Sequence, residues 1–80
     1  TMQYVPEDGV YVYFRYNEQQ TVMVVMNCND TTKTLKLDRF RERNNNVKSY
    51  LDIIRKEETI PVGNILQLGA YETRVFELKF

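Results

Sequence analysis

The chain has 80 residues, enough for one small domain with a single core and too few for a deep catalytic cleft. Hydrophobic residues make up 42% and charged residues 28%, which is the balance of an ordinary globular domain rather than of a disordered tail or a membrane span. The 11 Lys and Arg residues equal the 11 Asp and Glu residues in number, so no net charge attracts nucleic acid or an anionic membrane. We expect neither as a partner.

The first elements are a short extended segment at 3–5, a turn at 6–9, and two strands at 10–16 and 21–27 joined by the polar connection 17–20. Both strands are rich in β-branched and aromatic residues and therefore predict an antiparallel hairpin. Side chains alternate with a period of two. We expect one face of this hairpin to form the core, with the residues Val10, Val12, Phe14, Tyr16, Val22, Val24, Met26 and Cys28.

The opposite face of the hairpin is also apolar or aromatic. It is predicted to carry Tyr11 and Tyr13 from the first strand and Met23 and Val25 from the second. A free surface of this kind is unusual on a monomer. We therefore predict that these four residues form a face that docks on another domain.

The second half of the chain adds short strands at 34–37, 50–54, 59–62, 65–68 and 72–80. A single helical turn is predicted near 38–43, with Phe40 pointing inward. Turn signals recur at roughly 8- to 12-residue spacing, which is typical of an antiparallel sandwich or barrel. We predict one all-β domain over 1–80 with about seven or eight strands. Leu35 and Leu37 should point inward, and Phe76, Leu78 and Phe80 should share one face of the last strand.

Catalysis is not expected. The chain has no His, and its single Cys28, at the end of an apolar strand, is interpreted as a buried and inert thiol. The adjacent acids at 7–8 and 57–58 are interpreted as solvated turn charges, since neighbouring residues point in different directions. No cofactor is predicted.

Two polar clusters can each be interpreted either as a binding site or as an ordinary structural feature. The first, at 27–31, contains Asn, Asp and Thr and superficially resembles a calcium loop, but these are also the usual turn formers and no acid follows at a completing distance. The second, at 33–43, is basic but interleaved with Asp38 and Glu42, and it lacks a row of aromatic residues. We interpret the first as a turn and the second as a solvated helical face, and predict no metal site.

The tyrosines are the remaining candidates for a binding site. Exposed Tyr rings can stack on sugar rings, and Tyr11, Tyr13, Tyr50 and Tyr71 are candidates for such a surface. Docking on another domain and cross-strand packing inside this domain are alternatives. We rank docking first, internal packing second and sugar stacking third.

The segments 4–15, 21–27, 34–40, 50–54 and 66–78 together resemble the C-terminal β domain of α-amylase-type enzymes of glycoside hydrolase family 13, in particular its cyclomaltodextrinase and neopullulanase branch. The resemblance implies a Greek-key β-sandwich that follows a catalytic (β/α)8 barrel. In that family the barrel carries the catalytic aspartates and glutamate, and the calcium sites also lie outside this domain. No catalytic residue is therefore assigned to this chain, and its 63–64 and 69–72 turns depart from the usual simple turn of the family.

This resemblance implies a non-catalytic C-terminal domain, excised from a larger enzyme that acts on starch or maltodextrins, with the barrel as its partner. By likeness to gut-bacterial saccharolytic enzymes, the parent would be periplasmic or on the cell surface. Two alternatives remain open. One is a carbohydrate-binding module that stacks α-glucan on surface tyrosines, and the other is a small β domain that binds a protein partner.

Overall fold

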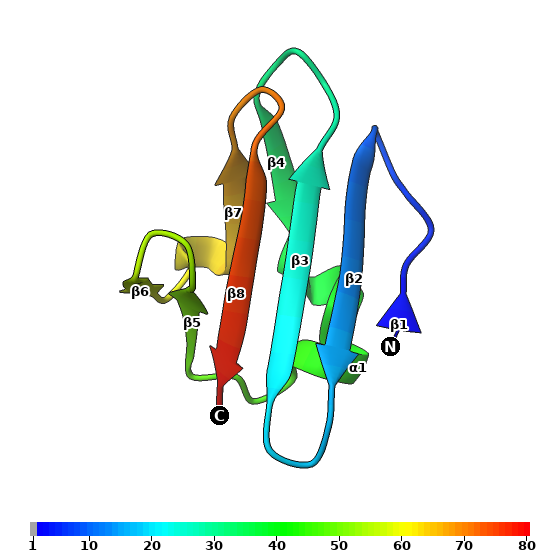
Figure 1. Cartoon of the computed structure of the whole chain (residues 1–80). Coiled ribbons are helices and arrows are strands. Elements are labelled where there is room, and N and C mark those ends of the chain that lie inside the picture. The colour runs from blue at the N-terminus through cyan, green and yellow to red at the C-terminus, as the bar shows by residue number, and fades with distance from the viewer. Residues whose placement is uncertain (1) are drawn as a thin grey trace.

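A computed structural model describes residues 2–80 and shows an antiparallel β-sandwich (Figure 1). The prediction of an all-β fold is confirmed, as is the short helical segment near 38–43. The strands are β1 (Met2–Gln3), β2 (Val10–Tyr16), β3 (Thr21–Asn27), β4 (Lys33–Lys36), β5 (Ser49–Asp52), β6 (Glu57–Thr59), β7 (Ile65–Leu68) and β8 (Thr73–Lys79). The helical segments are η1 (Leu37–Phe40), α1 (Arg41–Asn44) and η2 (Val62–Asn64).

The two layers of the sandwich are unequal. Strands β1-β2-β3-β8-β5-β6 form a six-stranded sheet in that order, and β4 and β7 form a two-stranded sheet. The chain leaves the larger sheet after β3 for β4, returns to it at β5 and β6, leaves again for β7 and ends in the larger sheet at β8. In Figure 1 the small sheet and the helical segments lie behind the large sheet, whose front face carries no second layer.

The core fills the space between these layers. Phe14, Phe40 and Phe76 are among the largest fully buried side chains. Tyr4 packs edge-on against Phe40, with ring centroids 4.8 Å apart, and so fastens the N-terminal segment to the core. The inward positions predicted for Leu35, Leu37 and Phe40 are confirmed. Of the residues predicted to share one face of the last strand, Phe76 and Leu78 are buried and Phe80 is exposed.

The connection between β2 and β3 decides which faces of the two strands lie together. Tyr16 pairs with Thr21 across the four intervening residues, so each even-numbered residue of β2 lies opposite an odd-numbered residue of β3. Residues directly opposite each other in an antiparallel pair share one face of the sheet. The inward face therefore combines even positions of β2 with odd positions of β3.

This register corrects the prediction for β3. Met23 lies opposite Phe14, Val25 lies opposite Val12, and both Met23 and Val25 are 0% exposed in the core. They do not form part of an outward docking face. A one-residue error in register exchanges the two faces of a strand completely. The outward residues of β3 are instead Val22, Val24 and Met26.

Of the predicted hairpin core, Val10, Val12 and Phe14 are confirmed as buried. Tyr16 is 40% exposed, and the guanidinium of Arg43 lies 4.0 Å from its ring centroid. Cys28 is exposed rather than buried, because the inward face of β3 ends at Asn27.

Candidate functional site

The front of the large sheet has an apolar centre, which we call the outer face. It consists of Tyr11, Tyr13, Val24, Met26 and Val75. Tyr11 pairs with Met26, Tyr13 pairs with Val24, and Val24 also pairs with Val75 across β8. Tyr11 is exposed, and the other four are half-buried by their neighbours. Three adjacent strands thus contribute to one continuous patch.

The surroundings of the outer face are more polar. A shallow hollow of about 270 Å³ lies over Gln3, Tyr11, Tyr13 and Met26. Toward the β2–β3 connection, Val22 lies between Arg15 and Glu77 in the register. An apolar centre with a polar rim is the usual anatomy of a protein interface.

Tyr11 and Tyr13 were predicted on an outward face of the sheet and lie there, whereas Val24, Met26 and Val75 were not predicted as members of this face. The length of the 17–20 connection could have indicated the correct face of β3. With four residues in the connection, even-numbered residues of β2 pair with odd-numbered residues of β3. Val75 required knowledge that β8 lies beside β3, which is a contact between distant parts of the chain.

Tyr50 is not a surface residue. It is 2% exposed, and its ring packs edge-on against Phe76 with centroids 5.7 Å apart. Its hydroxyl accepts a hydrogen bond of 3.2 Å from the Asn44 side chain. Burial raises the pKa of Tyr50, and the hydrogen bond from Asn44 opposes this effect. The proposed sugar-stacking role of Tyr50 is therefore wrong.

Tyr71 is exposed in the β7–β8 connection, just before the strand β8 that contributes Val75 to the outer face. Its backbone N–H donates to the carbonyl of Asn29 in the β3–β4 connection at 2.9 Å. Both connections lie at the upper end of the sandwich in Figure 1. Because Tyr50 is buried, the four tyrosines considered for sugar stacking do not form one surface.

The 27–31 segment acts as a turn, as its composition indicated. The Asn27 side-chain amide is buried and donates to the carbonyls of Thr31 and Gly69, at 3.0 and 2.9 Å. Its Oδ1 accepts the backbone N–H of Asn29 at 3.0 Å. Asn27 therefore ties two connections together. Within residues 2–80, no group of three or more His, Cys, Asp and Glu side chains could hold a metal ion.

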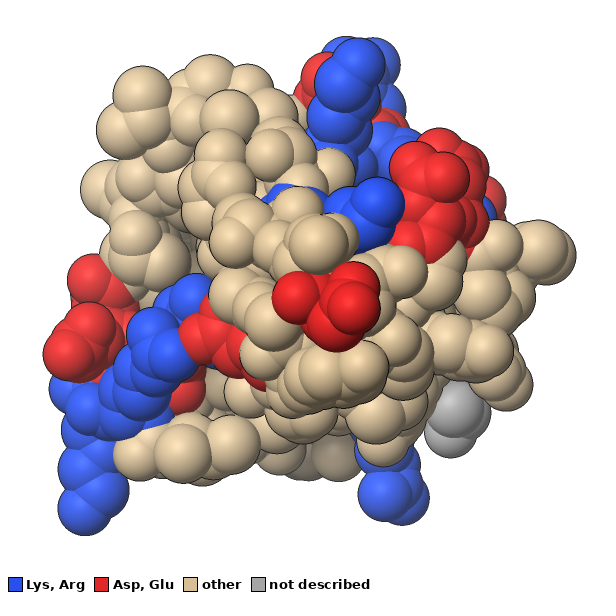
Figure 2. Space-filling model, turned by 90° about the horizontal axis from the view of Figure 1, so that it is seen from above, with Lys and Arg blue, Asp and Glu red and all other residues tan. Residues whose placement is uncertain are grey.

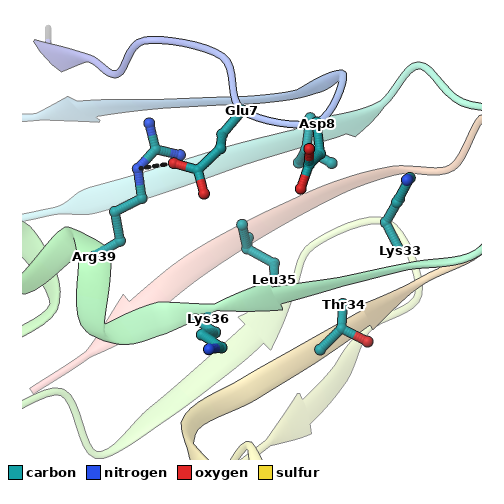
Figure 3. A pocket seen from close by; sticks show the side chains of 8 residues that line it. Glu7, Asp8, Lys33, Thr34, Leu35, Lys36 and Arg39 are labelled. Atoms are coloured by element: carbon teal, nitrogen blue, oxygen red, sulfur yellow. Dashed lines mark ion pairs between the residues drawn. The ribbon is translucent and has the colours of Figure 1, made fainter.

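A small polar pocket of about 260 Å³ lies between the turn before β2 and the free edge of β4 (Figure 3). Glu7 forms an ion pair with Arg39 across it, at 3.5 Å. Lys33, Lys36 and Asp8 also line it, and it contains no aromatic ring. Arg39 additionally lies 5.4 Å from the Phe40 ring centroid. The basic 33–43 segment is therefore partly occupied in packing and not only a solvated face.

The most buried charged group belongs to a structural ion pair. Arg74 Nε donates to Asp52 Oδ2 at 2.8 Å on the inner side of the large sheet, and Asp52 is 1% exposed. Asp52 also accepts the backbone N–H groups of Ile54 and Arg55, at 3.0 and 2.8 Å. Burial alone raises the pKa of Asp52, but these hydrogen bonds and the charge of Arg74 together lower it below its ordinary value. This carboxylate therefore joins β5 to β8 in its ionised form.

Comparison with known families identifies the kind of domain that this chain forms. Residues 1–77 match the family described as the cyclo-malto-dextrinase C-terminal domain. The chain belongs to this family. A search of curated proteins gave no match.

Membership of the cyclo-malto-dextrinase C-terminal domain family places the chain among the accessory, non-catalytic domains of amylase-like glycoside hydrolases. This confirms the resemblance inferred from the strand and turn pattern. Among residues 2–80, the structure contains no helix of the length and apolar character needed to span a membrane.

Proposed function

We propose that this domain is one unit of a longer enzyme that hydrolyses starch or maltodextrins, and that its outer face packs on the catalytic (β/α)8 barrel. The observation that carries the proposal is the contiguous apolar patch of Tyr11, Tyr13, Val24, Met26 and Val75 on an uncovered sheet. Family membership supports the rest of the parent enzyme as the partner, because a C-terminal domain is covalently attached to it.

The chemistry of the patch suits a permanent contact. A β-sheet normally buries one face, and this domain already buries its inner face against β4, β7 and the helical segments. The outer face is then free to pack against a neighbouring domain, which would cover it. Its central side chains are uncharged, so docking requires no desolvation of an unpaired charge. The domain would stabilise the barrel by covering apolar surface that both units otherwise expose.

The first test is the size of the native product. An antibody to this chain should detect a polypeptide that is several hundred residues longer, because a (β/α)8 barrel alone needs about 250 residues. A product of about the size of this chain would refute the accessory role and favour a free-standing adaptor domain.

The docking face itself is tested by Val24→Lys in the parent enzyme and in this chain alone. In the parent, we expect the substitution to detach the domain, so that a single calorimetric unfolding transition separates into two. In the isolated chain it should change the melting temperature by no more than about 2 °C, since Val24 points outward.

Thr34→Lys is the matched control for this experiment, because Thr34 is an exposed strand residue on the opposite layer. It should leave the single transition of the parent intact. Equal effects of the two substitutions in the parent would contradict docking through the outer face.

A further inference from the structure

One end of the sandwich is built from three turns that hold one another in place. They are the turn at 7–9, the β3–β4 connection at 28–32 and the β7–β8 connection at 69–72. The Asn29 side-chain amide donates to the carbonyl of Asp8 at 2.6 Å, and the Asn29 carbonyl accepts from Tyr71. Figure 2 looks down on this end, where much of the surface is uncharged and an acidic side chain lies near its centre.

Tyr71 occupies an unfavourable backbone conformation at this end. Its φ is +54°, in the left-handed region that an aromatic residue rarely adopts. Its side chain is 69% exposed, so packing of the ring inside the domain does not offset this strain. An exposed residue that keeps a strained conformation is a candidate for a functional contact.

The neighbouring hydrogen bonds explain how the strain persists. Asn27 holds the carbonyl of Gly69 from within the core, and the Glu72 carboxylate accepts the Gly69 N–H at 2.8 Å. Glu72 is in turn paired with Arg55. The turn is therefore anchored on both sides of Tyr71, and its ring is presented in a fixed place.

The surroundings of the ring indicate the class of ligand. No other large exposed hydrophobic side chain of the described residues belongs to these three turns. Asp30, Thr31 and Thr32 are exposed there instead. A protein hot spot usually lies in a well-packed pocket whose surrounding contacts exclude water. A sugar ring offers one apolar face to an aromatic ring and hydroxyl groups to polar neighbours, and a neutral glucan matches a chain without net charge.

We propose that Tyr71 is a stacking residue for an α-glucan chain, at a site separate from the outer face. The assignment of an α-glucan rests on the proposed function, since such chains are the substrates of that enzyme. The stacking site would hold a polymeric substrate beside the enzyme. The outer face would meanwhile remain docked on the barrel.

The test is a titration of the 80-residue chain with maltoheptaose, followed by ¹H–¹⁵N NMR. We expect saturable shifts at Tyr71, Glu72 and Asp30, with a dissociation constant of about 1 mM, as expected for one stacked ring. Tyr71→Ala should weaken binding by about tenfold or more, while Tyr71→Phe should keep it within about threefold. Tyr11→Ala, a tyrosine on the outer face, is the matched control and should bind as the unmodified chain does.

Tyr71→Gly separates binding from folding. Glycine adopts positive φ without strain, so this variant should melt at the same or a higher temperature and yet lose the sugar-induced shifts. Absence of saturable shifts up to about 20 mM sugar, unchanged binding by Tyr71→Ala, or equal binding of the β-linked cellotetraose would each overturn the proposal. These outcomes leave the docking experiment unaffected, because that experiment measures unfolding of the parent enzyme and involves no sugar.

Discussion

Replacing Asp52 by Asn is expected to lower the free energy of unfolding by about 3 kcal/mol. Asn keeps the shape of the side chain and one oxygen for the Ile54 and Arg55 N–H groups, but it leaves the guanidinium of Arg74 without a charge partner. Only 13% of the Arg74 side chain is exposed, so water replaces little of the lost interaction. Urea unfolding of the two proteins measures the difference.

Glu77→Gln is the control for this substitution. Glu77 pairs with Lys79 at 3.4 Å near the surface, with the lysine side chain 43% exposed. An exposed pair of this kind contributes about 0–1 kcal/mol. A loss at Asp52 no larger than the loss at Glu77 would show that the buried pair does not stabilise the sandwich.

The Asp52 carboxylate should also make the stability of the folded chain sensitive to acid. The pKa of Asp52 is lower in the folded chain than its ordinary value of 3.8, so the unfolded chain binds the proton more readily. The stabilisation is present above about pH 4 and is lost as the pH falls through the folded pKa. Urea midpoints measured between pH 7 and pH 2 should therefore fall more steeply for the unmodified chain than for Asp52→Asn. Parallel curves would contradict this assignment.

Met23→Ala is expected to destabilise the chain by about 2–5 kcal/mol, whereas Met26→Ala should cost less than about 1 kcal/mol. The two methionines lie on one strand, but Met23 is 0% exposed in the core and Met26 lies on the outer face. For a domain of this size, whose total stability is on the order of 4–12 kcal/mol, the first substitution removes a large part.

Thermal or urea unfolding of both methionine variants measures this difference directly. Because the residue type and the strand are the same, intrinsic β propensity cancels in the comparison. Equal losses would contradict the register between β2 and β3. In the parent enzyme the expectation changes, since Met26→Ala should then also weaken the docked interface.

The positions of most strands could be predicted because their causes are local. Alternating β-branched and aromatic residues define β2 and β3, and turn residues separate the later strands. Phe40 could be placed inward from its short helical segment alone. The family resemblance rests on the same local pattern of strands and turns, and it is confirmed over residues 1–77.

The candidate site was less predictable because it depends on pairing. Tyr11 and Tyr13 were expected on an outer face, and they lie there. Their partners across the sheet were assigned to the wrong face of β3, although the strand itself was correct. Tyr50 was also misplaced, since its burial results from pairing with Leu78 of the last strand.

The sequence by itself determined the antiparallel β class, most of the strand positions and the family, since these follow from side-chain alternation and turn chemistry between neighbouring residues. The strand predicted at 59–62 lies instead at Glu57–Thr59. Only the tertiary structure decided which face of β3 is buried, that Asp52 meets Arg74 and that Tyr71 is held exposed. Each of these depends on contacts between residues far apart in the chain, and a strand whose two faces are both apolar carries no local signal that distinguishes core from surface.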